Sequence, residues 1–207
     1  SNAHARILDG KGRIEKIVSN YASLSFNFGP TLLSWLNESR PELHDALIES
    51  DKTSAQRFGG HGSAIAQVFN HIIMPLASPR DQKTQVVWGL RDFERRFGRA
   101  SEGMWLAETA VDLASLEALA EQGVAYTILA PHQCARIRPP SGEWRDAVDP
   151  RRPYLLHLPS GRSLAVFFYD GPISQAVAFE RLLDDGYRFA ERLLKNFDDR
   201  AEPQLVH

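Results

Sequence analysis

The chain alternates short apolar runs with longer amphipathic stretches over most of its length, as strands alternating with helices do. Side chains that switch between apolar and polar predict the first strand, and continuous apolar runs predict further, buried strands. Two of the runs flank the turn sequence Pro-Ser-Gly-Arg at 159–162 and therefore predict a β-hairpin. The predicted strands are 21–28, 103–106, 124–130, 154–158 and 163–169.

Helices are predicted where apolar residues recur at a spacing near 3.6 positions, with capping residues at several of their ends. Pro30 and Pro41 suit the first turn of two helices, Asp112 suits a helix cap, and Gly98 suits a helix end. His71 falls within one apolar stretch, where a packed polar residue is expected. Strands that alternate with helices favour a parallel α/β sheet or barrel. The predicted helices begin at Pro30, Pro41, Asp112 and Asp170, or cover 64–74, 81–97 and 184–197.

The composition is that of an ordinary folded protein, and it narrows the possible partners. Of the 207 residues, 43% are hydrophobic and 24% are charged, and the formal net charge is -2. This near balance gives no electrostatic basis for binding nucleic acid or an anionic membrane, and no apolar run is long enough to span a bilayer. The single cysteine, Cys134, excludes an internal disulfide and fits a reducing, cytoplasmic location.

The two ends of the chain suggest a piece of a longer protein. Residues 1–3, Ser-Asn-Ala, lack a methionine and resemble the remnant of an expression tag. Residues 204–207, Gln-Leu-Val-His, are typical of a strand that is just beginning. We therefore expect one partial domain over 4–207, truncated at both ends, whose exposed strand edges would allow oligomerisation.

Functional side chains in α/β proteins gather just past the carboxyl ends of strands. Asn27, Glu108, His132 and Asp170 each follow a predicted strand, and His61 lies in a glycine-rich loop. No His-x-His or Cys-x-x-Cys pair accompanies the two histidines, so we expect neither a metal nor a cofactor. Asp170 also begins the sequence Asp-Gly-Pro, a helix-capping pattern that explains the residue without any role in a site.

Glu108 is the sharpest of these candidates. It follows the short run Met-Trp-Leu at 104–106, which is expected to form a buried strand. The indole face of Trp105 and a carboxylate together suit a sugar site, with the carboxylate as nucleophile or base. The alternative is that Glu108 only supplies negative charge at the start of the next helix.

Several segments carry a resemblance that covers nearly the whole chain. The most specific is Phe-Gly-Arg at 97–99 followed by Glu-Gly-Met-Trp-Leu-Ala-Glu-Thr-Ala at 102–110. Further segments are 20–33, 57–63 (Arg-Phe-Gly-Gly-His-Gly-Ser), 71–76 (His-Ile-Ile-Met-Pro-Leu) and 168–174 (Phe-Tyr-Asp-Gly-Pro-Ile-Ser). Together they resemble glycoside hydrolase family 57 from about residue 6 to 207.

The resemblance implies a distorted (β/α)7 barrel that acts on α-glucans with retention of configuration. We accordingly expect an incomplete (β/α)7-type barrel of the glycoside hydrolase/deacetylase superfamily, with a β-hairpin inserted near 153–169. The family's third motif, Trp-Leu-x-Glu, implies that Glu108 is the nucleophile. Its second motif corresponds to 60–63 and 71–75, where Ser63 stands at the position of the usual Glu.

The resemblance also implies an α-glucan or oligosaccharide as the partner. A retaining enzyme needs a second carboxyl group, the general acid, which the family carries in an Asp-Gly-Glu segment. That segment is expected beyond residue 207, so this chain alone would be inactive, and a strand ending in His-x-Pro is expected upstream of Arg6. Two alternatives stay open: a metal-dependent polysaccharide deacetylase, and a non-catalytic glycan-binding domain. The candidate substrate-binding residues are Trp105, His61, His132, Asp170 and Asn27.

Overall fold

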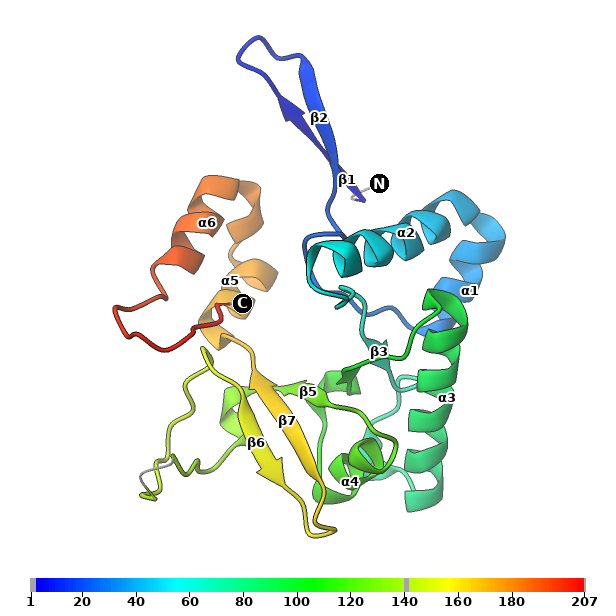
Figure 1. Cartoon of the computed structure of the whole chain (residues 1–207), viewed down its shortest axis with the longest axis vertical. Coiled ribbons are helices and arrows are strands. Elements are labelled where there is room, and N and C mark those ends of the chain that lie inside the picture. Colours follow the sequence, from blue (N-terminus) through cyan, green and yellow to red (C-terminus); the bar gives the residue numbers. More distant parts are fainter. Residues whose placement is uncertain (1–2, 140–141, 207) are drawn as a thin grey trace. The chain divides into compact units, whose positions relative to one another are not determined.

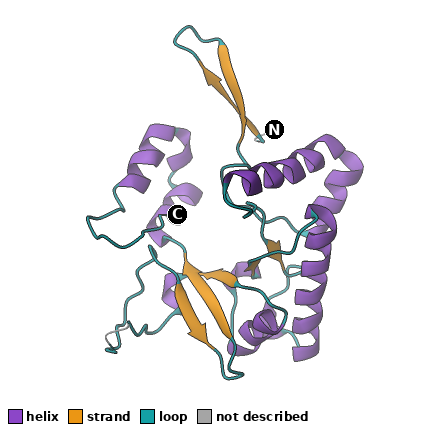
Figure 2. Cartoon of the chain, in the orientation of Figure 1, coloured by secondary structure: helices purple, strands orange, loops and turns teal. Residues whose placement is uncertain are grey.

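The computed structural model describes residues 3–139 and 142–206, which form helices and short strands (Figures 1 and 2). The α/β class is confirmed, and the chain packs as two compact units, Ser1–Val124 (unit 1) and Ala125–His207 (unit 2). Of the expected tag remnant only Ala3 is among the described residues. No helix in the described part of the chain has the length and apolarity needed to cross a membrane.

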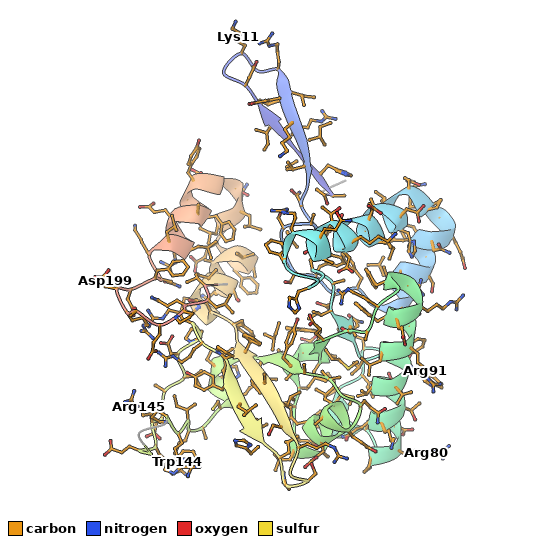
Figure 3. All side chains as sticks on the ribbon, viewed as in Figure 1. Lys11, Arg80, Arg91, Trp144, Arg145 and Asp199 are labelled. Carbon is orange, nitrogen blue, oxygen red and sulfur yellow. The ribbon has the colours of Figure 1, made fainter. Side chains whose placement is uncertain are left out.

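Unit 1 combines a hairpin, four α-helices and two very short parallel strands. The hairpin, which the sequence pattern does not predict, extends from the unit with Lys11 near its tip (Figure 3). In chain order the elements are β1 (His4–Leu8), β2 (Ile14–Ser19), α1 (Pro30–Ser39), α2 (Pro41–Arg57), β3 (Ala66–Gln67), the 3-10 turn η1 (Met74–Leu76), α3 (Pro79–Phe97), β4 (Met104–Trp105), the 3-10 turn η2 (Ala107–Thr109) and α4 (Leu113–Glu121).

The helix boundaries of unit 1 follow local sequence chemistry. Pro30 and Pro41 begin α1 and α2, as predicted, where the missing N–H of proline leaves no bond unmade. The Asp112 side chain caps α4 by accepting a hydrogen bond from the Ser115 backbone N–H at 2.8 Å. Gly98 ends α3 at a φ of +69°, a left-handed conformation that glycine adopts without strain.

Two predictions in unit 1 are wrong. Residues 21–28 do not form a strand: the chain turns after Asn20, and only Phe26 makes an isolated parallel bridge, to Ala64. Residues 64–74 are not a helix but contain β3 and a loop that leads to η1. Every residue from 64 to 68 is buried, and a fully buried strand gives the same largely apolar run as a buried helix, so periodicity cannot separate them.

Close packing and one buried ion pair hold the central strands of unit 1. Helix α3 lies so close to β3 that a Cβ on Gly89 would be 2.2 Å from the Gln67 carbonyl oxygen. At the amino end of the strand, Asp51 of α2 accepts hydrogen bonds from the Ala64 backbone N–H and from Nε and Nη2 of Arg99, each at 2.8 Å. Because Asp51 is 1% exposed, this pair is an internal anchor for the strand.

Unit 2 is built on a three-stranded sheet of order β5-β7-β6. Strand β7 pairs in parallel with β5 and antiparallel with β6, so the predicted strands 124–130, 154–158 and 163–169 are all present. The elements are β5 (Tyr126–Leu129), the 3-10 turn η3 (Pro131–Gln133), β6 (Tyr154–His157), β7 (Ser163–Phe168), α5 (Gly171–Phe179), the 3-10 turn η4 (Leu182–Asp184) and α6 (Gly186–Leu194).

The expectation that the hairpin is an insertion into an incomplete barrel needs correction. The hairpin near 153–169 exists, but its second strand, β7, lies at the centre of the unit 2 sheet rather than outside it. The reason is the parallel pairing of Tyr126–Leu129 with Ala165–Phe168, which a local hairpin signal cannot reveal. The described residues form three separate sheets and no closed barrel.

A cluster of charged side chains joins the segment before β6 to the region after α6 in unit 2. Asp149 accepts hydrogen bonds from Arg151 Nε at 2.8 Å and from Arg200 Nη1 at 2.6 Å, and Arg151 also donates to Asp198 at 2.7 Å. Burial acts to raise the pKa of Asp149. The hydrogen bonds from Arg151 and Arg200 outweigh it and hold the pKa well below the ordinary value of 3.8.

We expect unit 2 to lose stability as the pH falls below that ordinary value. A depressed pKa in the folded state means that the unfolded chain takes up the proton first, so the stabilisation is complete above 3.8 and disappears as the pH approaches the folded value. Hydrogen exchange of the β7 amides, measured from about pH 6 downward, follows this loss. Asp149→Asn should weaken protection at about pH 6 and flatten its pH dependence; parallel profiles for the two proteins would contradict the assignment.

Candidate active site

Three segments of unit 1, namely Phe26 and the strands β3 and β4, run parallel to one another. Their carboxyl ends therefore lie at the same edge of the paired strands. Phe26 bridges Ala64, the residue two positions before β3, and β3 pairs in parallel with β4. Asn27, His71 and Glu108 follow the carboxyl ends of these three segments. This is the edge at which parallel α/β sheets assemble binding sites.

A row of polar and aromatic side chains crosses this edge. The buried Gln67, at the end of β3, accepts a hydrogen bond from Asn27 Nδ2 at 2.8 Å. Gln67 is also the register partner of Trp105 at the end of β4, and Trp105 is half-buried. Two of the residues expected at a sugar site, Asn27 and Trp105, therefore lie on either side of Gln67.

Glu108 projects from a tight turn directly after β4. Leu106 and Ala107 are completely buried, whereas the Glu108 side chain is 75% exposed. The backbone N–H groups of Thr109 and Ala110 each donate at 3.0 Å to the carbonyl oxygens of Leu106 and Ala107. The turn thus begins from a fixed, buried strand end and points its carboxylate into solvent.

Backbone strain is concentrated at this edge. Among the described residues, four that are not glycine have a positive φ, and three of them belong here: His71 at +53°, Glu108 at +55° and Thr109 at +52°, the fourth being Arg181 of unit 2. A left-handed backbone costs roughly 1–3 kcal/mol per residue of this kind and persists where the surrounding structure enforces it. Strain of this kind is typical of sites that hold a side chain in one orientation.

His71 joins Glu108 at the site, contrary to the prediction of a packed helical residue. Its Nε2 lies 3.7 Å from Glu108 Oε1, and the two side chains are 56% and 75% exposed. The prediction is wrong because it rests on a helix over 64–74, whereas His71 lies in the loop after β3. The polar pair Asn-His at 70–71 interrupts the apolar run and was the available signal, since both residue types tolerate a left-handed backbone.

His61 and Ser63 lie at the opposite, amino edge of the same strands. His61 Nδ1 is 2.8 Å from an oxygen of Glu102, which precedes β4, and both side chains are exposed. Ser63 is buried and donates to the Tyr21 carbonyl oxygen at 2.7 Å. Ser63, which stands where the family motif usually has Glu, therefore lies toward the end of the strands opposite to the Glu108 carboxylate.

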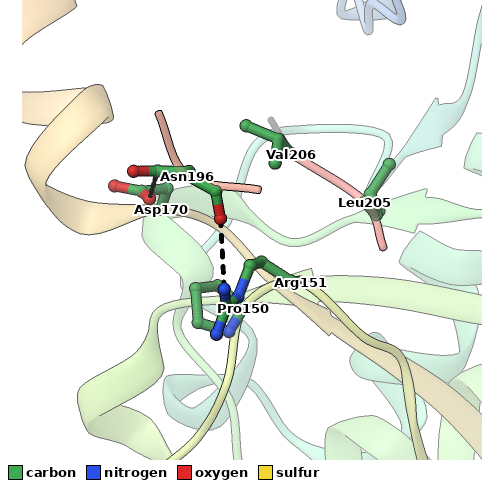
Figure 4. A pocket seen from close by; sticks show the side chains of 6 residues that line it. All are labelled: Pro150, Arg151, Asp170, Asn196, Leu205 and Val206. Carbon is green, nitrogen blue, oxygen red and sulfur yellow. Dashed lines mark hydrogen bonds between the residues drawn. The ribbon is translucent and has the colours of Figure 1, made fainter. Parts of the chain in front are cut away.

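In unit 2, His132 and Asp170 follow the carboxyl ends of the parallel strands β5 and β7, and His132 is exposed. Asp170 accepts a hydrogen bond from the Ile173 backbone N–H at 2.8 Å and another from Asn196 Nδ2 at 2.5 Å (Figure 4). The first bond confirms the predicted cap of α5. Asp170 also lines a small depression with Asn196, Arg151 and three apolar residues, Pro150, Leu205 and Val206.

Within the described residues, no three His, Cys, Asp or Glu side chains are grouped so as to hold a metal ion.

These features define a parallel α/β protein that presents a carboxylate and an imidazole from strained turns at the carboxyl edge of its strands. The sequence model of the family described as "Glycosyl hydrolase family 57" matches residues 12–206. The chain belongs to this family.

Individual relatives are distant and much longer. The chain is 27% identical over 106 residues to Alpha-amylase 1 of Dictyoglomus thermophilum, a match covering 51% of this chain and 15% of the relative. It is 23% identical over 116 residues to the 4-alpha-glucanotransferase of Thermococcus litoralis, covering 55% and 16%. The chain thus spans only a small part of these curated relatives.

Solved structures show the same fold. The 4-alpha-glucanotransferase from Thermococcus litoralis superposes with a TM-score of 0.60 at 16% identity, over 87% of this chain and 31% of that one. An exo-type maltose-forming amylase from Pyrococcus sp. ST04 gives a TM-score of 0.58 at 19% identity, over 78% and 25%. At these identities the likeness concerns the fold alone.

Proposed function

We propose that this chain forms the nucleophile-bearing part of a retaining enzyme that hydrolyses or transfers α-glucans, with Glu108 as the nucleophile. The observation that supports this most is the turn after β4, where a strained backbone exposes Glu108 at the edge where α/β sites form. Family membership and the names of the relatives, an amylase and a glucanotransferase, agree with it.

In this reaction a Glu108 carboxylate oxygen attacks the anomeric carbon and forms a glycosyl ester, while the bond from that carbon to the departing oxygen breaks. The departing oxygen takes a proton from a second carboxyl group. Water or a sugar hydroxyl then attacks the same carbon, gives its proton back to that group and releases Glu108. The two inversions together retain the configuration.

The neighbouring residues suit sugar binding. Trp105 offers an apolar face on which a sugar ring can stack, and Asn27, held by Gln67, offers an amide oxygen to a hydroxyl. His132 and Asp170, which follow the strand ends of unit 2, are candidates for polar contacts with a sugar in that unit.

The second carboxyl group has no assigned residue in this chain. We propose that the chain alone leaves maltooligosaccharides and glycogen uncleaved, because an unactivated glycosidic oxygen does not depart without a proton. Turnover of either substrate that disappears in Glu108→Gln would overturn this.

Trapping with a fluorinated α-glucosyl fluoride tests the class of protein. Fluoride departs without a proton donor, so the nucleophile is expected to form a long-lived ester even where the acid is missing. Intact-mass measurement should then find one added sugar per chain. Reversible binding of maltooligosaccharides without any added mass would favour the glycan-binding alternative and count against an enzyme.

A further inference from the structure

The contact between His71 and Glu108 joins two turns that have the same unusual backbone. His71 lies four positions past Gln67, and Glu108 lies three positions past its register partner Trp105. Their φ values are +53° and +55°. Two neighbouring strands thus end in left-handed residues whose side chains meet, Nε2 to Oε1, at 3.7 Å.

Neither side chain has a packing role that would explain this arrangement. Both are more than half exposed, so burial of the imidazole contributes little to the core. Glycine is the default residue for a left-handed turn, and histidine, although it tolerates this backbone better than most residues, does not match glycine there. What the imidazole does contribute is a ring nitrogen, Nε2, that lies 3.7 Å from one carboxylate oxygen.

A carboxylate nucleophile needs such a partner. An exposed glutamate rotates about three side-chain bonds, and attack requires one oxygen to be held in line with the anomeric carbon. A donor on one oxygen fixes the plane of the carboxylate and leaves the other oxygen free. The 3.7 Å distance is longer than a hydrogen bond, and contacts of this kind at active sites commonly shorten to hydrogen bonds when substrate is bound.

We propose that His71 is a positioning residue for the nucleophile: its Nε2–H donates to Oε1 of Glu108 and leaves Oε2 to attack. The inference rests on the proposed function, since it assigns the orientation of that same nucleophile. Loss of the His71 donor is therefore expected to lower the rate of attack and to leave the sugar affinity unchanged, because orientation governs the first and not the second.

Three variants separate this role from a structural one. His71→Gly removes the donor and relaxes the left-handed backbone. His71→Gln restores an N–H donor at the same number of bonds from Cβ. Arg181→Gly is the matched control, because Arg181 is the remaining left-handed residue in the described chain that is not glycine, with a φ of +56°, and its charged partner is Asp184.

The experiment measures covalent labelling by the fluorinated α-glucosyl fluoride, together with the midpoint of urea unfolding. For His71→Gly we expect the maximal labelling rate to fall at least about tenfold. The half-saturating sugar concentration and the unfolding midpoint should not fall. His71→Gln should return to within about threefold of the parent rate, and Arg181→Gly should label at the parent rate.

The outcomes distinguish the inference from the proposed function. An unlabelled parent chain would overturn the proposed function and the inference with it. A labelled parent and an equally fast His71→Gly would overturn the inference alone. The inference would also be overturned if His71→Gly lost both labelling and stability, since His71 would then have a structural role. It would be overturned as well if His71→Gln did not recover the labelling rate, since an N–H donor would then not be what the site needs.

Discussion

Glu108→Gln is expected to lower the rate of covalent labelling by at least about a thousandfold. The amide has nearly the shape of the carboxylate but lacks the negative charge and the nucleophilic oxygen that form the glycosyl ester. Because the Glu108 side chain is 75% exposed and its backbone conformation suits either residue equally, the fold should be unchanged. Intact-mass measurement of labelling against time gives the rate.

Glu102→Gln is the matched control for this prediction. Glu102 is also an exposed carboxylate paired with a histidine in unit 1, but it precedes β4, whereas Glu108 follows it. We expect its labelling rate to equal that of the parent. Equal losses in the two variants would mean that the general charge of the unit matters rather than the nucleophile.

Asp51→Ala is expected to destabilise unit 1 by about 3 kcal/mol, within the range for breaking a buried ion pair. The change removes three hydrogen bonds and leaves Arg99, whose side chain is only 22% exposed, without its partner. The pair packs directly against Gly62, where a Cβ would lie 2.3 Å from both Arg99 and Asp51. Urea unfolding followed by tryptophan fluorescence measures the loss.

Glu49→Gln on the same helix gives the comparison. Glu49 pairs with Lys52 at 3.6 Å, and both side chains are more than half exposed, so its removal should cost less than about 1 kcal/mol. A similar small loss for Asp51→Ala would show that the buried pair does not anchor β3.

The parts of the fold that sequence predicts are those determined by a few adjacent residues. The prolines that begin α1 and α2, the Asp112 cap of α4 and the glycine that ends α3 each act within one helical turn. The position of Glu108 after a short buried strand is local in the same sense. These features need no knowledge of the rest of the chain.

The parts that sequence does not predict depend on contacts between distant segments. Asp51 and Arg99 are 48 positions apart, and nothing in either neighbourhood indicates the partner. Likewise β3 has only two residues, and the residues next to it in the sequence are mostly apolar. Such a stretch suits a buried helix as well as a buried strand. For this reason the sequence places His71 in a helix rather than in the loop after β3.

The edge of a strand at which a motif residue lies is also a tertiary property. Asn27 and His61 both flank short strand segments, yet Asn27 follows its segment and His61 precedes the next one. Spacing along the sequence gives no reason to prefer one of these two residues over the other as a site residue. Only the direction of the parallel strands separates the edge of Glu108 from the edge of His61.

Peptide mapping of the trapped chain identifies the nucleophile. After labelling with the fluorinated α-glucosyl fluoride and digestion, tandem mass spectrometry locates the residue that carries the sugar. We expect a single ester on Glu108, in the peptide that contains Trp105. A sugar attached to any other residue, Asp170 included, would contradict it.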